Sequence, residues 1–225
     1  MKIAPILALV GATLFVGGTS QAKERGPSAF VRVLHAISNG PKVDVFVDGK
    51  KILNDNTFDA LSAYYRIPSG YHTFRIASNN PTRILVSGSR NFGTNHFYTV
   101  GVFGRLNKPQ LFAADDTAPR VPYNRALLSV YHLSPGAPAV NVTGTINGTR
   151  VVTLARDLTY NRRGVLAIPA VPMTIRITRT KQPVNIGILR TVTGFKPKAG
   201  LKYTAYVIGN VSRNFTVLLN KAATQ

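Results

Sequence analysis

The sequence predicts an all-β protein made of two tandem antiparallel β-sandwich domains behind an N-terminal signal peptide. The first observation is an internal repeat, because residues 31–35 and 41–45 return as residues 128–132 and 138–142. A period of about 100 residues is the size of a domain rather than of a solenoid unit. The second observation is a series of short alternating segments between Gly, Pro and Asn turns, without long helical periodicity, which is typical of a sandwich or barrel.

The N-terminus has the three parts of a secretory signal. Lys2 supplies a positive charge, residues 3–16 are mostly apolar, and small and polar residues follow up to Ala22. We expect cleavage after Ala22. The alternative, a membrane anchor, needs about 20 apolar residues, and this run is shorter and contains Pro5 and Gly11. The pattern predicts an exported protein, located outside the cell or in the cell envelope (periplasm or surface), with no transmembrane segment once the signal is removed.

The expected strands of the first domain follow from alternation and turn residues. Val31 and Val33 share a side with His35, and Asp48-Gly49 is a typical hairpin turn between two such strands. Residues 59–62 are the one place where a helical turn is expected. The strands are expected at residues 30–36, 43–47, 50–53, 63–67, 71–76, 83–87, 97–103 and 110–113.

The second domain repeats this order, with Asn147-Gly148 as its hairpin turn. Its strands are expected at residues 127–132, 139–145, 150–154, 164–168, 172–178, 184–189, 201–208 and 215–219. Residues 115–122 are polar and contain two prolines, as linkers do. We therefore divide the chain into a signal peptide (1–22), a first sandwich (23–114), a linker (115–124) with a solvated Asp115-Asp116, and a second sandwich (125–225).

The composition excludes thiol chemistry and points to acidic partners. The chain has no cysteine, so disulfides, thiolate metal sites and lipidated cysteines are all excluded. It has 28 Lys and Arg against eight Asp and Glu, a formal net charge of +20. Such an excess attracts polyanions of many kinds. The basic residues are scattered, and the nearest approaches to clusters are Arg162-Arg163, Arg179 with Lys181, and Lys196 with Lys198, which we take as candidate polyanion contacts.

The repeat carries a recognisable motif. The stretch from His35 to Gly49, then residues 67–70 and 98–100, resembles the exported tandem β-domain family known as domain of unknown function 4397 (DUF4397). Residues 115–116 followed by 132–140 look like the start of that family's second copy. The resemblance implies a secreted or cell-surface protein, often bacterial, with paired Ig-like or transthyretin-like sandwiches and no established catalysis. This chain departs from the pattern at Asn141, which stands where the first copy has Asp44, and in its positive charge.

The repeated motif includes the residues with most chemical potential: His35, Pro41 and Asp44, and their counterparts His132, Pro138 and Asn141. A catalytic histidine needs a nucleophile and an orienting carboxylate, and a metal site needs further ligands. We favour a structural role, in which each imidazole bridges backbone groups at a strand end and holds the turn before the proline. A His-dependent hydrolase using His35 or Asp44 remains the lesser alternative.

Other candidates have simpler explanations. Asp44, Asp48, Asp55 and Asp59 do not follow a calcium-loop spacing. Tyrosines interleaved with arginines are compatible with base stacking, but tyrosine is also an ordinary strand residue. Four glycosylation sequons, at Asn141, Asn147, Asn210 and Asn214, stay open because their use depends on the organism. No metal, cofactor or catalytic site is predicted.

The sequence therefore favours a non-enzymatic structural or adhesion module. Its basic surface is expected to dock on an anionic glycan, a lipid headgroup or an acidic protein surface. The alternative is a general polyanion-binding protein for nucleic acid or heparin-like chains, although no nucleic-acid motif supports it.

Overall fold

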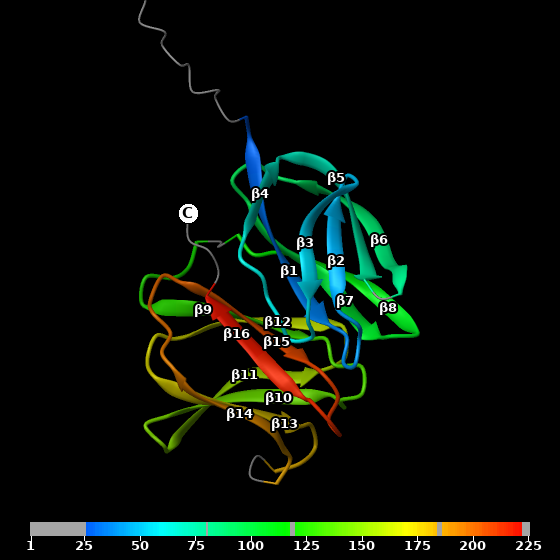
Figure 1. Cartoon of the computed structure of the whole chain (residues 1–225). Coiled ribbons are helices and arrows are strands. Elements are labelled where there is room, and N and C mark those ends of the chain that lie inside the picture. Colours follow the sequence, from blue (N-terminus) through cyan, green and yellow to red (C-terminus); the bar gives the residue numbers. More distant parts are fainter. Residues whose placement is uncertain (1–25, 80, 118–119, 184–185, 222–225) are drawn as a thin grey trace, which may run out of the picture.

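The chain folds as two β-sandwiches, seen in the computed structural model that describes residues 26–79, 81–117, 120–183 and 186–221 (Figure 1). The predicted signal peptide lies outside the described residues. The strands of the first sandwich are β1 (Ser28–Ala36), β2 (Val43–Val47), β3 (Lys50–Asn56), β4 (Tyr65–Pro68), β5 (Gly70–Asn79), β6 (Thr82–Phe92), β7 (Phe97–Arg105) and β8 (Lys108–Asp115). Those of the second are β9 (Arg125–His132), β10 (Val140–Ile146), β11 (Arg150–Leu158), β12 (Arg162–Pro169), β13 (Met173–Arg179), β14 (Ile188–Phe195), β15 (Lys202–Ile208) and β16 (Thr216–Lys221).

The two sandwiches have the same topology. In the first, a β4–β1–β7–β8 sheet faces a β3–β2–β5–β6 sheet, and in the second a β12–β9–β15–β16 sheet faces a β11–β10–β13–β14 sheet. Adding eight to each strand number of the first sandwich gives the second, so the repeat in the sequence is a repeat of the fold. This confirms the predicted all-β fold class.

Two details differ from the expectation. The central pairs β1–β7 and β9–β15 are parallel, so each sandwich has one parallel pair among antiparallel ones. The expected helical turn at 59–62 is also wrong, because Asp59 has a φ of 63° and Leu61 forms an isolated bridge with Leu34 in β1. A left-handed residue ends any helix at that point.

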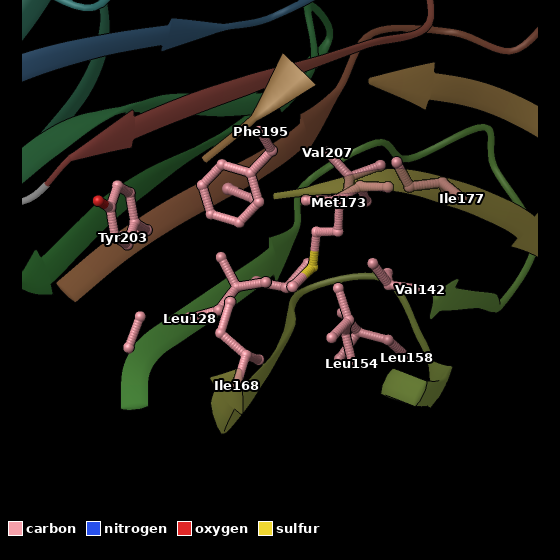
Figure 2. Close-up of a cluster of buried hydrophobic side chains, with 14 of the residues drawn as sticks. Leu128, Val142, Leu154, Leu158, Ile168, Met173, Ile177, Phe195, Tyr203 and Val207 are labelled. Carbon is pink, nitrogen blue, oxygen red and sulfur yellow. The ribbon is translucent and has the colours of Figure 1, made fainter. Parts of the chain in front are cut away.

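Each sandwich has its own core. In the first, inward-facing residues such as Val31, Val45, Phe74 and Val100 are buried between the sheets. In the second, the thioether of Met173 lies among Leu128, Leu154 and Phe195 (Figure 2). The alternation of apolar residues along each strand supplies these cores, as period-two patterning requires. Without disulfides, this packing is the main source of stability.

A third core joins the two sandwiches. It consists of residues on the outward faces of β1, β7 and β8 and of β9, β15 and β16, which pack against each other between the two bodies of Figure 1. Aromatic rings dominate it: Tyr131 stacks on Tyr206 with centroids 5.6 Å apart, and Phe112 meets both rings edge-on. The two sandwiches are thus packed through an apolar interface and are not merely joined by a linker.

Candidate polyanion-binding surface

The two histidines of the repeat have matching surroundings. His35 Nε2 lies 2.9 Å from the Pro41 carbonyl oxygen, and its Nδ1 accepts a hydrogen bond from the Ile37 N–H at 3.3 Å. His132 makes the same pair of contacts with the Pro138 carbonyl, at 3.0 Å, and the Ser134 N–H, at 3.4 Å. Nε2 must therefore donate and Nδ1 accept, which is the neutral Nε2–H tautomer. Each ring bridges two backbone groups of the turn that leads into β2 or β10.

Burial keeps these imidazoles neutral. Both histidines are fully buried, and desolvation lowers the pKa of His35 and of His132 despite the favourable contact with a proline carbonyl. Both ring nitrogens are occupied by backbone groups. Neither histidine therefore has a free nitrogen with which to hold a metal or take a proton from a substrate.

Asp44 and Asn141 make the same hydrogen bond in the two copies of the repeat. The oxygen Oδ1 of Asp44 accepts the Asp55 N–H at 3.0 Å, and Oδ1 of Asn141 accepts the Asp157 N–H at 2.9 Å. Asp55 and Asp157 have left-handed backbones, with φ of 53° and 46°. They lie where the register of β3 and β11 shifts against β2 and β10. The side-chain oxygen at this position accepts the N–H of the bulged residue, and an amide oxygen can accept it as well as a carboxylate oxygen can.

The prediction that Asp115-Asp116 is a solvated linker is wrong for Asp116, which is buried, while Asp115 is partly exposed at the end of β8. Asp116 is 1% exposed, and its Oδ2 lies 3.1 Å from Nη2 of the buried Arg32 at an angle too bent for a hydrogen bond. Arg32 Nε donates to Thr99 Oγ1 at 2.8 Å, and the Thr99 hydroxyl in turn donates to Asp116. Burial is the largest influence and opposes the charge on Arg32, but Asp116 together with Tyr206 and Tyr64 outweighs it and raises the pKa of the guanidinium.

This ion pair belongs to the junction between the sandwiches. Tyr206 from β15 donates to Thr99 of β7 at 3.0 Å. Lys202 from the same strand donates to the carbonyls of Asp115 and Thr117, at 3.3 and 3.2 Å. Desolvation lowers the pKa of Lys202, although both aspartates counteract it. The Thr99 hydroxyl and the backbone carbonyls of Asp115 and Thr117 thus connect the first sandwich to the second.

The aspartates of the described chain are mostly engaged inside the fold. Asp48 accepts the Thr73 N–H and contacts His72, and Asp115 accepts the Thr117 N–H and contacts His96. Among the described residues, Lys and Arg form ion pairs with carboxylates only at Arg32 and Lys51. The remaining described cations are mostly exposed and have no carboxylate at ion-pairing distance. The excess charge is therefore presented to solvent.

The six candidate cations do not form one patch. Arg162 and Arg163 open β12, opposite His132 and Tyr131. Arg163 Nη1 donates to the Tyr131 hydroxyl at 3.3 Å, which attaches it to the domain junction. The other four cations are separated by the length of β13. Arg179 is the last residue of β13 and Lys181 lies just beyond it, whereas Lys196 and Lys198 follow Phe195, which pairs with Met173 at the start of β13.

Sequence reasoning missed a basic and aromatic group on the first sandwich. Phe46 in β2 faces outward, with the Arg75 guanidinium 4.7 Å and the Lys51 ammonium 5.5 Å from its ring centre. Register explains the group, because Phe46 pairs with both residues across β3 and β5. The signal was present in the sequence only as an apolar residue on the polar side of β2, where the second copy has Thr143.

In the described ranges, no three His, Cys, Asp or Glu side chains are grouped so that they could hold a metal ion. No helix in that part of the chain is long and apolar enough to cross a membrane.

The family follows from a match that covers just over half of the chain. Residues 29–143 match the family described as "Domain of unknown function (DUF4397)". The chain belongs to this family. The DUF4397 match begins in β1 and ends in β10, so it includes the motif of His35 and Asp44 and also its second appearance at His132 and Asn141.

Comparison with other proteins adds little to the family assignment. No curated protein matches the chain. Among solved structures, the chain is similar to the TIE protein of Bacillus anthracis at 11% identity and a TM-score of 0.27, with 82% of this chain and 33% of that one covered. It is also similar to suggested cell adhesion proteins of Bacteroides fragilis (12% identity, TM-score 0.25, 87% and 98% covered) and Bacteroides ovatus (9%, 0.27, 89% and 100%). With scores this low, the likenesses say nothing about what this DUF4397 member binds.

Proposed function

We propose that the protein is a non-enzymatic structural or adhesion module, exported from the cell, whose basic surface docks on anionic partners of the envelope or on acidic glycans. The main support for this proposal is the difference between the acidic side chains, which are engaged within the fold, and the basic ones, which mostly are not. The described aspartates mostly serve turns, bulges and the domain junction, whereas most cations have no carboxylate partner. A net charge of +20 that is not neutralised internally creates a long-range attraction for polyanions.

The repeated motif supports a non-enzymatic role. His35 and His132 are buried and bonded to backbone on both ring nitrogens, and Asp44 is occupied by the β3 bulge and by Lys51. A general base or nucleophile must reach its substrate. The groups that first suggest a hydrolase are thus committed to holding turns and bulges.

The separation of the cations supports docking on an extended partner. Arg179 and Lys196 lie at opposite ends of the second sandwich, and the Phe46 group lies on the first. Such a distribution suits a long polymer or a charged layer better than a small ligand. The proposed location, at the cell surface or outside the cell, follows from the N-terminal signal pattern.

Retention of the mature protein on immobilised heparin, on immobilised duplex DNA and on uncharged agarose tests this proposal. We expect retention on heparin at low salt and none on agarose. Stronger retention on heparin than on DNA supports a glycan or envelope partner, whereas equal retention at matched charge density favours a general polyanion binder. Passage through all three columns without delay would overturn both.

A further inference from the structure

Four turns from the two sandwiches meet around one hollow. This cavity of about 400 Å³ is lined by Ser38, Asn39, Gly104, Arg105, Leu106, Pro135, Gly136, Gly209 and Asn210. The lining comes in equivalent pairs, because residues 38–39 of the first copy correspond to 135–136 of the second, and 104–105 to 209–210. The duplication therefore brings the β1–β2 and β7–β8 turns together with the β9–β10 and β15–β16 turns.

A second hollow extends the first. Its volume is about 230 Å³, and it is lined by Arg105, Lys108, Gln110, Pro135 and Tyr160. Arg105 and Pro135 line both hollows, so the two hollows adjoin, and we call them together the junction groove. The first hollow alone lies within the volume range of small-molecule sites, roughly 300–1,000 Å³.

The charged groups of the junction groove have one sign. Arg105 and Lys108 flank the tip of the β7–β8 turn and are exposed, and neither has a carboxylate at ion-pairing distance among the described residues. No lining residue of the groove is acidic. A concave surface lined by cations concentrates a positive electrostatic field within it, which attracts anions. A guanidinium also forms charge-assisted hydrogen bonds with the oxygens of an anionic group.

The other side chains offer neutral hydrogen-bonding groups. The side-chain oxygen Oδ1 of Asn210 accepts both the N–H and the hydroxyl of Ser212. Its Nδ2 is therefore presented beside Gly136, 3.3 Å from the place that a Cβ would occupy there. Gln110 Nε2 donates to the Tyr160 hydroxyl at 3.3 Å. Amide and phenol groups of this kind suit the hydroxyls of a sugar.

The walls of the groove are held in place by contacts across the junction. The Tyr160 ring packs against Phe103 with centroids 5.9 Å apart. Burial raises the pKa of the Tyr160 hydroxyl, and the Arg105 charge opposes the rise. Ser38 of the first sandwich donates to Asn214 of the second at 2.7 Å. A ligand would therefore meet a site that is largely formed in advance.

We propose that the junction groove binds one acidic sugar unit of an anionic glycan, with the sulfate or carboxylate between Arg105 and Lys108 and the hydroxyls toward Asn210 and Tyr160. This inference rests on the proposed function and adds a specific subsite to its diffuse basic surface. Neutral groups set it apart from a simple anion site, since an inorganic ion would use only the two cations.

The test is calorimetric titration of the mature protein with a heparin-derived disaccharide, comparing R105Q/K108Q with K50Q/R150Q. Both variants remove two positive charges from exposed side chains, but Lys50 and Arg150 lie in the β2–β3 and β10–β11 hairpins, at the ends of β2 and β10 remote from the turns that line the groove. Removal of two charge-assisted contacts should weaken binding roughly tenfold or more. We expect that loss for R105Q/K108Q and little change for K50Q/R150Q, with unfolding midpoints unchanged in both.

The remaining outcomes distinguish a failure of the groove proposal from a failure of the proposed function. Equal loss in both variants, or a disaccharide that fails to bind while full-length heparin binds, would overturn the groove and leave the proposed function standing. Inorganic sulfate binding as tightly as the disaccharide would overturn the role of the sugar hydroxyls. Failure of heparin and disaccharide alike would overturn both proposals.

Discussion

Asp116 is the single side chain with the greatest expected effect on stability. Its carboxylate compensates the buried Arg32 charge, and both groups are almost completely removed from water. Asp116→Asn keeps the shape and removes the charge, which leaves the guanidinium unpaired. Breaking a buried pair in this way costs about 3–5 kcal/mol. Urea unfolding at neutral pH measures the change.

The neighbouring Asp115 is the matched control. It pairs with His96, and both side chains are about two-fifths exposed, at 40% and 43%. Asp115→Asn should lower the free energy of unfolding by about 1 kcal/mol or less. Similar effects of the two substitutions would show that the Arg32–Asp116 pair does not hold the junction.

Asn141 tests the shared role of the bulge position. Asn141→Asp should leave the free energy of unfolding nearly unchanged, because either side chain offers an oxygen to the Asp157 N–H. Asn141→Ala removes the acceptor and should cost about 1 kcal/mol, the net value of a typical hydrogen bond. Thermal or urea unfolding of the two variants measures these changes. If Asn141→Asp destabilised the protein as much as Asn141→Ala, the acceptor role of this side chain would be contradicted.

The two buried histidines predict a pH dependence. Their pKa values in the folded protein lie below the unfolded value of about 6.5. Below that pH the unfolded chain therefore binds more protons than the folded one. Their contribution to stability is complete above about pH 6.5 and is lost as the pH falls toward their folded pKa values. The free energy of unfolding should decrease between pH 7.5 and pH 5.

The double variant H35Q/H132Q isolates this effect. It should be less stable than the wild type at pH 7.5, and its free energy of unfolding should fall less steeply toward pH 5. The other titrating groups are common to both proteins and cancel in the difference. Parallel pH profiles would mean that the two histidines are not buried in the neutral form.

At the scale of the element, the parallel β1–β7 pair depends on a glycine. A Cβ at Gly101 would lie 2.0 Å from the Leu34 carbonyl oxygen, a backbone atom that cannot move aside. Gly101→Ala should therefore destabilise the first sandwich by roughly 1–3 kcal/mol, the usual range for overpacking. Gly26→Ala is the control, since nothing lies within 4 Å of its Cβ position. Equal unfolding midpoints for the two variants would contradict this close approach.

The strands were the most predictable part of the molecule. Every strand expected from alternation overlaps an observed strand, because every second residue of these strands is apolar and points into a core. The largest offset is at β14, expected from residue 184 and observed from Ile188. There the alternation is weak, and residues 184–185 lie outside the described ranges. The parallel pairing of β1 with β7 was not predictable, because alternation does not reveal which strands are neighbours.

The candidate site was less predictable. The bridging by His35 and His132 was expected from the recurrence of the proline six residues later. The clusters of cations were identified as neighbours in sequence, but strand direction places them at opposite ends of a sandwich. The role of Asp116 was missed because an acidic pair before prolines looks like a linker, and only tertiary structure brings Arg32 to it.

At the scale of the whole molecule, the two copies are alike in their cores and different at their junction. Leu34 in the first copy corresponds to Tyr131 in the second, and Gly101 to Tyr206. The larger residues of the second copy supply the stacked rings of the interface. The two copies thus share their fold, and the contact between the sandwiches uses outward-facing positions at which the copies differ. A single sequence does not show which outward faces will meet.

The proposed function requires that the uncompensated positive charge of the paired sandwich recruits an anionic polymer. The most direct measurement is the equilibrium constant for heparin binding at a series of NaCl concentrations. We expect log K to fall linearly with log salt, with a loss of roughly tenfold or more between about 50 and 200 mM, as counterion release requires. A binding constant that does not change with salt, or no binding at the lowest concentration, would contradict the claim.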